Sequence, residues 1–368
     1  MQKDFHYYAT YCAAFLAGFS HEESLDICYS AQFVDECSAT LLKKINAPLN
    51  AATTQLQMEL MNARTDIVGR QNITRIWSSF HFLPRDLNAK VKGGKLYRDK
   101  YRLICGPNGE LLRETVKLAK GKNLQAVGIA MHILADTWAH RSFAGTPTLV
   151  INDTGKDFYE IIEENGNPIR KRIYFYENVK AGDDLEAGKY IRTVYHTDEN
   201  SVMNLGHGRA GHLPDYSFMR YIYLPAWGAY KEEFKDNPAE YYNAFTQMIY
   251  AMRYLRGEET DFLLNTYSDD ISASYETEIM SILTRRQLDS CNDWKAFGEK
   301  LSGKEVIPFD VRAYQKEYTS AESDKKDMTD AGRFFAAAQR QKSMVTDKIF
   351  ASGNLLAGFS KMKRSENA

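Results

Sequence analysis

Three ionisable residues recur at a helical interval within the segment 123–145, which otherwise carries almost no charge. They are His132, Asp136 and His140, spaced at i, i+4 and i+8, so a helix places their side chains on one strip, about 6 Å apart. The surrounding residues are apolar on nearly every face, which predicts a buried helix. A buried carboxylate between two imidazoles is costly unless a cation pairs with it. A single buried histidine is usually a hydrogen-bonded core residue, whereas three such groups in register predict a metal site.

A second group of ligand-type side chains lies in the segment 204–215, NLGHGRAGHLPD. His207, His212 and Asp215 stand there among three glycines, and glycine lets irregular backbone approach a ligand closely. Two histidines and an aspartate have the composition of a metal-binding loop. A surface loop with incidental histidines has the same composition, so both interpretations stay open.

An aspartate also stands on the apolar side of the helix expected over residues 20–45. A capping box of Ser20 and Glu23 opens this helix, and Asp35 falls on the same side as its apolar residues. An acid in that position is either a metal ligand or a buried group satisfied by hydrogen bonds. The local sequence favours neither of these two roles.

The elements that must position these residues are predicted to be mainly α-helical, with a small β insertion. A compact helix is expected over residues 7–19, whereas residues 47–118 show short strand-like alternations and contain His81 just before a proline. The segment 148–200 is polar and rich in Tyr and β-branched residues, with a hairpin turn at 165–168. Further helices are expected over residues 216–233, 238–256, 260–287, 292–302, 309–323 and 328–362.

The length of 368 residues is large for a single core. We expect a helical metal-binding domain over residues 1–255, with the β-rich insertion at 148–200, and a helical extension over 256–368 packed on it. His21 and His196 stand among charged residues and are expected to face solvent.

Composition excludes several classes of protein. The formal net charge is −1, which does not predict a nucleic-acid binder held by a basic field. The five cysteines are scattered without a CxxC spacing, so a disulfide framework or thiolate zinc site is not expected. The sequence has no apolar run long enough for a transmembrane helix and no signal-peptide pattern. We therefore expect a cytoplasmic protein, or one exported without a cleavable signal peptide.

The HxxxD spacing on a buried helix, together with a histidine near the N-terminus, resembles the zinc-dependent phospholipase C superfamily. The fungal single-strand nucleases share that fold. The sequence is most similar to an uncharacterised bacterial group whose members begin with DFHYY directly after the start, as residues 4–8 do here. The resemblance covers residues 1 to about 255 and implies a multi-helix bundle that holds zinc ions in a cleft.

The resemblance also implies which residues bind two or three zinc ions. Asp35, His81, His132 and Asp136 would bind the first ion, and Asp136 would be shared with a neighbouring ion. The second ion would be bound by the group His140, His207, His212 and Asp215. A third ion would be bound by His6 together with either the amino group of Met1 or the carboxylate of Asp4, and Asp4 could instead only orient His6.

These ligands predict a chemistry. Imidazole nitrogen and carboxylate oxygen without thiolate suit open, catalytic zinc, which lowers the pKa of bound water to about 7 and stabilises charge at phosphorus. We expect a phospholipase C-like hydrolase of phosphodiester bonds, with Asp35 as a candidate general base beside the attacking water. Lipid or small-molecule substrates are favoured over nucleic acid, because phosphate contacts to nucleic acid normally need clustered Lys and Arg. The alternatives are a nuclease of the same fold and a noncatalytic interaction protein whose metals only join its helices.

Overall fold

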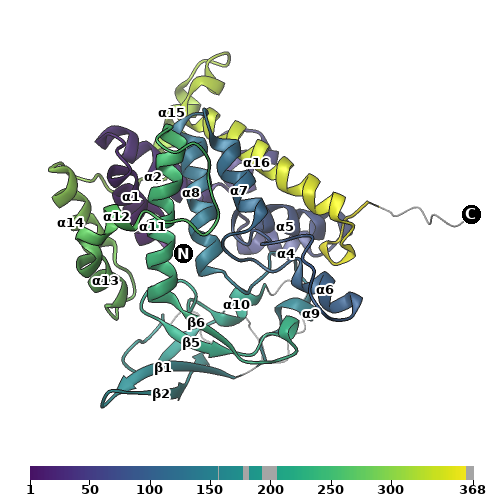
Figure 1. The fold of residues 1–368 in the computed structure, drawn as a ribbon. Coiled ribbons are helices and arrows are strands. Elements are labelled where there is room, and N and C mark those ends of the chain that lie inside the picture. The colour runs from purple at the N-terminus through teal and green to yellow at the C-terminus, as the bar shows by residue number, and fades with distance from the viewer. Residues whose placement is uncertain (156, 177–181, 193–204, 362–368) are drawn as a thin grey trace, which may run out of the picture.

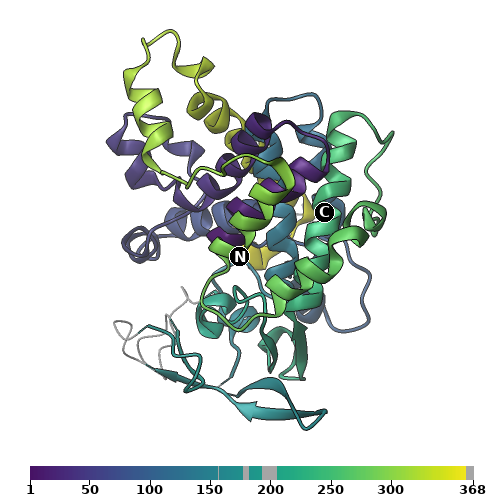
Figure 2. The ribbon, with the colours of Figure 1, turned by 90° about the vertical axis from the view of Figure 1, so that its left-hand side faces the viewer.

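Helices form the body of the molecule, and a small sheet covers one end of it. The computed structural model describes residues 1–155, 157–176, 182–192 and 205–361. Figures 1 and 2 show the helices as one body and the strands as a layer beneath it. The predicted fold class, mainly helical with a small β insertion, is confirmed at this level.

The central helix is α8 (Leu124–Ala139), which other helices surround. Every residue from 125 to 139 is buried. The helix begins where the Asn123 side chain accepts a hydrogen bond from the Ala126 amide, and it ends at His140, which is its C-cap. The helices in contact with it are α2 (His21–Glu36), α5 (Ile67–Phe80), α7 (Glu110–Ala119), α11 (Asn237–Arg256) and α16 (Asp330–Ser352). The apolar character of the segment therefore predicted its burial correctly, although its helical part is shorter than 123–145.

The N-terminal segment is helical but more divided than predicted. A π-helical turn, η1 (Asp4–Ala9), runs into α1 (Thr10–Leu16). The capping box of Ser20 and Glu23 at the start of α2 is confirmed. That helix ends at Glu36 and not at residue 45, because Ser38 caps a separate helix, α3 (Ala39–Lys44).

The strand-like interpretation of residues 47–118 is wrong. This segment contains η2 (Leu49–Ala51), α4 (Gln57–Ala63), α5, α6 (Lys95–Tyr101) and α7. Asp66 caps α5 by accepting a hydrogen bond from the Gly69 amide, and Ile73, Ile76 and Phe80 are buried at helical spacing. A short apolar alternation reads equally well as one face of a helix, and packing against the core decides between the two.

The predicted hairpin is present, and the sheet extends beyond the predicted insertion. Strands β1 (Phe158–Glu164) and β2 (Asn167–Arg172) are antiparallel around the turn at Asn165 and Gly166, both of which have positive φ. The helix expected over 216–233 is wrong, because β5 (Arg220–Tyr223) and β6 (Glu233–Asp236) continue the sheet in the order β2-β1-β5-β6. A short parallel pair lies beside it, β3 (Tyr174–Tyr176) and β4 (Lys189–Ile191). His196 lies outside the described residues.

The C-terminal third is helical and shares the main core. Buried residues of one cluster run from Met1 to Phe359, and α16 packs against both α8 and α5. The division at residue 255 stays a prediction. In the described part of the chain, no helix is both long and apolar enough to cross a membrane. The other helical elements after α8 are α9 (Leu149–Asn152), α10 (Gly206–Ala210), η3 (Ala226–Gly228), α12 (Asp269–Ser272), η4 (Ala273–Tyr275), α13 (Glu276–Thr284), α14 (Cys291–Ser302), α15 (Arg312–Ser320), η5 (Lys326–Met328) and η6 (Leu355–Ala357).

Candidate metal centre

The carboxylate of Asp136, in the last turn of α8, lies at the centre of a buried polar cluster. Its Oδ2 atom is 3.2 Å from both His81 Nδ1 and His132 Nε2. Its Oδ1 atom is 2.9 Å from the amino group of Met1 and 3.1 Å from His6 Nε2. The two oxygens of one carboxylate therefore face two different groups of nitrogen atoms.

The group on the Oδ2 side has the dimensions of a tetrahedral site. His81 Nδ1 and His132 Nε2 are 3.3 Å apart, and Asp35 Oδ1 lies 3.8 and 3.9 Å from these two nitrogens. Ligands about 2.1 Å from a tetrahedral zinc ion are about 3.4 Å from one another. Two overlapping triads can hold a metal ion, each with ligand atoms within 4.8 Å of one another: His6, Asp35 and His132, and His81, His132 and Asp136.

The hydrogen bonds of the two histidines on this side determine which nitrogen carries the proton. His132 Nδ1 donates to the carbonyl oxygen of Ala31 at 2.9 Å, and His81 Nε2 donates to that of Thr53 at 3.1 Å, because a carbonyl can only accept. In the neutral rings, the two nitrogens that face each other are then both unprotonated. Two lone pairs and two carboxylates directed at one point repel each other unless a cation lies between them.

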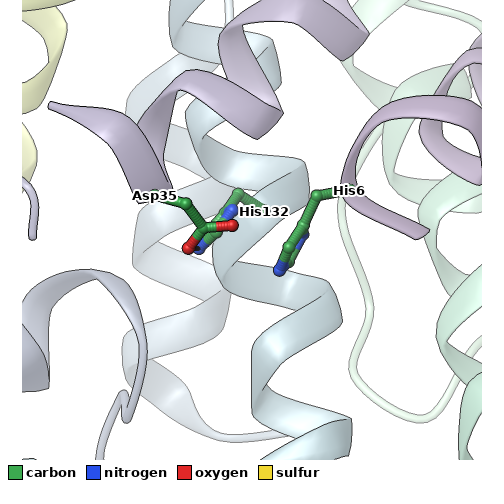
Figure 3. A group of neighbouring side chains, drawn as sticks. All are labelled: His6, Asp35 and His132. Carbon is green, nitrogen blue, oxygen red and sulfur yellow. Dashed lines mark ion pairs between the residues drawn. The ribbon is translucent and has the colours of Figure 1, made fainter. Parts of the chain in front are cut away.

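His6 adds a further nitrogen, whose polar neighbour is the carboxylate of Asp136. Its ring stacks on that of His132 at 3.8 Å between centroids, and Figure 3 shows His6, His132 and Asp35 pointing toward a common space. The side chain is fully buried, yet neither ring nitrogen makes a hydrogen bond, since Nε2 approaches Asp136 without hydrogen-bonding geometry. Burial lowers the pKa of both His6 and His132 to about 4, so both rings are neutral at pH 7 and available as ligands.

The group on the Oδ1 side contains the amino group of Met1, which is buried in the middle of the molecule (Figures 1 and 2). This nitrogen lies 3.2 Å from Asp215 Oδ1 and 3.4 Å from His140 Nε2, and these two atoms are 3.7 Å apart. Burial opposes the charge of the ammonium, but Asp136 and Asp215 outweigh it and raise the pKa of the amino group to about 11. The protonated amino group of Met1 therefore occupies the space beside Asp136 and Asp215. A neutral amino group could share that space with a metal ion.

The cluster opens to solvent at Asp35, whose side chain is 31% exposed, while that of Asp136 is 1% exposed. Burial raises the pKa of Asp35. For Asp136, burial acts in the same direction, but His140 and the Met1 ammonium outweigh it and hold its pKa well below the usual range. The central carboxylate is therefore ionised, and the carboxylate at the opening is the more basic one.

Comparison with known proteins gives a family but no activity. Residues 1–349 match the family model described as "Family of unknown function (DUF6765)". The chain belongs to DUF6765. No curated protein and no solved structure matches it. The resemblance of this DUF6765 chain to the phospholipase C superfamily therefore stays a prediction.

Three of the predicted ligands of this DUF6765 chain are not part of the described cluster. Asp4 accepts hydrogen bonds from the amides of Phe5, at 2.8 Å, and Ser290, at 2.9 Å, so its carboxylate is already used to hold η1 against the segment before α14. His212 is exposed and pairs with Asp183 at 3.1 Å. The side chain of His207, in α10, lies outside the described residues.

Sequence reasoning missed several groups that hold the cluster in place. The backbone carbonyls of Ala31 and Thr53 leave no signal in a sequence. A buried ion-pair network at the end of α8 was also missed, in which Lys235 Nζ donates to the Trp138 carbonyl at 3.0 Å and pairs with Glu240. Glu240 also pairs with Arg141 at 2.7 Å. Arg141, directly after His140, was the signal of this network that the sequence contained.

Proposed function

We propose that this protein is a zinc-dependent hydrolase of phosphodiester bonds. Asp35, His81, His132 and Asp136 would bind one ion through the atoms that already lie 3.2–3.9 Å apart. Asp136 would bind a second ion through its other oxygen, together with the group His6, His140, Asp215 and the Met1 amino group. The observation that carries the proposal is the pair of ring nitrogens of His81 and His132, which lie 3.3 Å from each other and 3.2 Å from Asp136 Oδ2, while the other nitrogen of each ring faces a backbone carbonyl.

The donor set suits zinc in a hydrolytic role. Nitrogen and carboxylate ligands without thiolate favour zinc that keeps an open position. When bound, zinc ions supply water of lowered pKa and electrostatic stabilisation of the phosphoryl oxygens. Neither triad of candidate ligands contains a cysteine, and the thiol of Cys105, whose Sγ lies 4.0 Å from the Asp136 carbonyl oxygen, has its pKa raised by burial.

The protein's own residues would perform the remaining steps. Asp35, at the opening, would accept a proton from the attacking water, because its raised pKa makes it the stronger base. Water oxygen would then form the new P–O bond as the bond to the leaving oxygen breaks, and that oxygen would depart with the bonding electron pair and take a proton from solvent. Asp136 would stay ionised throughout and offer one oxygen to each ion, and the carbonyls of Ala31 and Thr53 would keep the ligand rings in orientation.

The exposed edge at Asp35 favours a catalytic site over metals that only join helices. A structural zinc site is normally closed by protein ligands on all sides. Here a carboxylate of the proposed first site is about a third exposed, so water reaches it. Lipid and small phosphodiesters remain the favoured substrates.

The test combines metal analysis with a substrate panel. Untagged protein should contain at least two equivalents of zinc and hydrolyse phosphatidylcholine micelles or bis-p-nitrophenyl phosphate. Asp35→Asn should reduce turnover at least ~100-fold, whereas His212→Ala, which alters a histidine outside the cluster, should not. Cleavage of single-stranded DNA alone would favour the nuclease alternative, and full zinc occupancy without turnover on any substrate would favour the noncatalytic one.

A further inference from the structure

Apolar side chains are exposed on three neighbouring elements away from the metal centre. Ile67 and Val68, at the start of α5, are 73% and 62% exposed, Leu96 on α6 is 55% exposed, and Leu355 on η6 is 66% exposed. Scattered exposed apolar residues are ordinary, but a group on adjoining elements marks a contact surface.

Hydrogen bonds from side chains to backbone carbonyls join these three elements. Gln71, four residues after Ile67 on α5, donates to the carbonyl of Gly358 just after η6 at 3.0 Å. Asn354, just before η6, donates to the carbonyl of Asp99 on α6 at 2.7 Å. Figure 1 shows α5, α6 and the end of α16 on the same side of the helical body. We call this surface, formed by the start of α5, α6 and η6, the α5–α6 face.

The α5–α6 face is also basic. Segment 85–102 contains seven Lys and Arg against two Asp, in a chain whose formal net charge is −1. Four lysines belong to this segment: Lys90, Lys92, Lys95 and Lys100. None of them forms an ion pair with an acidic group among the residues that the structure describes. Elsewhere many surface lysines are paired, as Lys348 is with Glu114. The cations of this face are therefore available to a partner.

We infer that the α5–α6 face docks on an anionic lipid surface. Exposed aliphatic side chains next to unpaired lysines are what a peripheral contact with a bilayer requires, because the former enter the headgroup region and the latter attract anionic lipids. Single-stranded nucleic acid is bound mainly by stacking on aromatic rings, and the exposed apolar residues here are aliphatic. A second copy of this chain would bring two basic faces together.

The α5–α6 face and the metal centre lie at opposite ends of helix α5. Ile67 is at the start of α5, and His81 is the C-cap of the same helix. A helix of 14 residues spans roughly 20 Å. The inference does not depend on the proposed reaction, because binding to vesicles is measured without turnover.

The electrostatic half of the inference is tested with vesicles of phosphatidylcholine containing about 30 mol % phosphatidylglycerol. The full chain should float with these vesicles at low salt and bind pure phosphatidylcholine at least ~10-fold more weakly. Lys92→Glu with Lys95→Glu should lower binding to the mixed vesicles at least ~10-fold. The control pair Lys122→Glu with Lys316→Glu makes the same charge change on other elements and should leave binding within about twofold.

A second pair of substitutions tests the contribution of the exposed apolar side chains. Ile67→Ser with Val68→Ser should lower vesicle binding at least ~10-fold, whereas Ile307→Ser with Met328→Ser, exposed apolar residues on other elements, should not. Circular dichroism melts confirm that each variant is folded. The inference is overturned if neither test pair lowers vesicle binding more than its control. It is also overturned if the wild type binds a single-stranded oligonucleotide and no vesicles.

Discussion

At the scale of single residues, Asp136 connects the two halves of the cluster because its two oxygens face different partners. Oδ2 approaches ring nitrogens from α8 and from the end of α5, while Oδ1 approaches the Met1 amino group and His6. A carboxylate with this many nitrogen neighbours stays ionised even in a buried site, as its depressed pKa indicates. Loss of its charge should therefore disturb both halves at once.

Asp136→Asn should reduce zinc content by at least one equivalent, because an amide is a weak ligand and cannot bridge two cations. Elemental analysis of the purified variant measures this directly. Asp183→Asn is the matched control, since the Asp183 side chain is 1% exposed, as that of Asp136 is, pairs with His212 and lies outside the cluster. Unchanged zinc content in the Asp136 variant would contradict the proposed shared ligand.

A second prediction concerns the amino group of Met1 as a metal ligand, and it applies to a chain that begins at Met1. A Gly-Ser extension before Met1 should displace that amine from Asp136 and Asp215 and lower the metal content by about one equivalent. Asp4→Asn should leave the stoichiometry unchanged, because Asp4 is occupied by two backbone amides. If the extension changes nothing, the amine is not a ligand of the second ion.

The residues of the cluster differ in how far the sequence could predict them. His132, Asp136 and His140 were predictable because helical spacing alone aligns them. Asp35 and His81 come from other helices, so only the resemblance assigned them to the same ion. His212 was misleading, because a sequence does not show that Asp183, 29 residues earlier, is its partner.

At the scale of elements, the contact between α2 and α8 sets the distance between Asp35 and His132. Gly128 makes this contact possible, since a Cβ atom there would lie 2.4 Å from the Ile27 carbonyl oxygen and 2.6 Å from the Ser30 Cβ. Both neighbours belong to α2, where backbone cannot move without shifting the helix. The glycine thus has a packing role in the metal centre without any contact to a metal.

Gly128→Ala should lower the free energy of unfolding by about 2 kcal/mol, since overpacking outweighs the gain in helix propensity. It should also weaken zinc binding, because α2 carries Asp35. Chemical denaturation and zinc titration measure the two effects. Gly94→Ala is the control, since no atom lies within 4 Å of a Cβ built there, and equal effects of the two substitutions would contradict the packing role.

The errors in element prediction have one physical cause. Tyr221 and Tyr223 are completely buried in β5, where they pair with β1, yet their surroundings had been assigned to a helix. Residues of α5 had been assigned to strands. Short segments have too few turns to distinguish the two periodicities, and the partner that decides the matter is distant in the sequence.

At the scale of the whole molecule, α16 closes the core over the segment after α3, and a half-buried lysine lies in that contact. Lys342 Nζ donates to the carbonyl of Ala52 at 2.9 Å and lines a cavity of about 560 Å³ together with Asn50 and Gln55. Burial lowers the pKa of Lys342 to about 8. The folded state therefore binds this proton less tightly than the unfolded state does.

Lys342→Met should raise the free energy of unfolding by about 2 kcal/mol at pH 7, after allowing for the lost hydrogen bond. The ammonium is penalised fully below pH 8, and the penalty disappears as the pH approaches the unfolded pKa of 10.5. The advantage of the variant should shrink over that range in denaturation curves. An advantage independent of pH would exclude the buried charge as its source.

The cluster joins residues that are synthesised at different times. His6 stacks on His132, and Asp215 lies beside His140. The parts of one small cluster lie more than 200 residues apart, from His6 to Asp215. At translation rates of roughly 5–20 residues per second, the first histidine waits roughly 10–40 s for the last carboxylate. Throughout that interval the N-terminal histidine lacks the last carboxylate of its cluster. The ribosome therefore completes most of the polypeptide before the centre can exist.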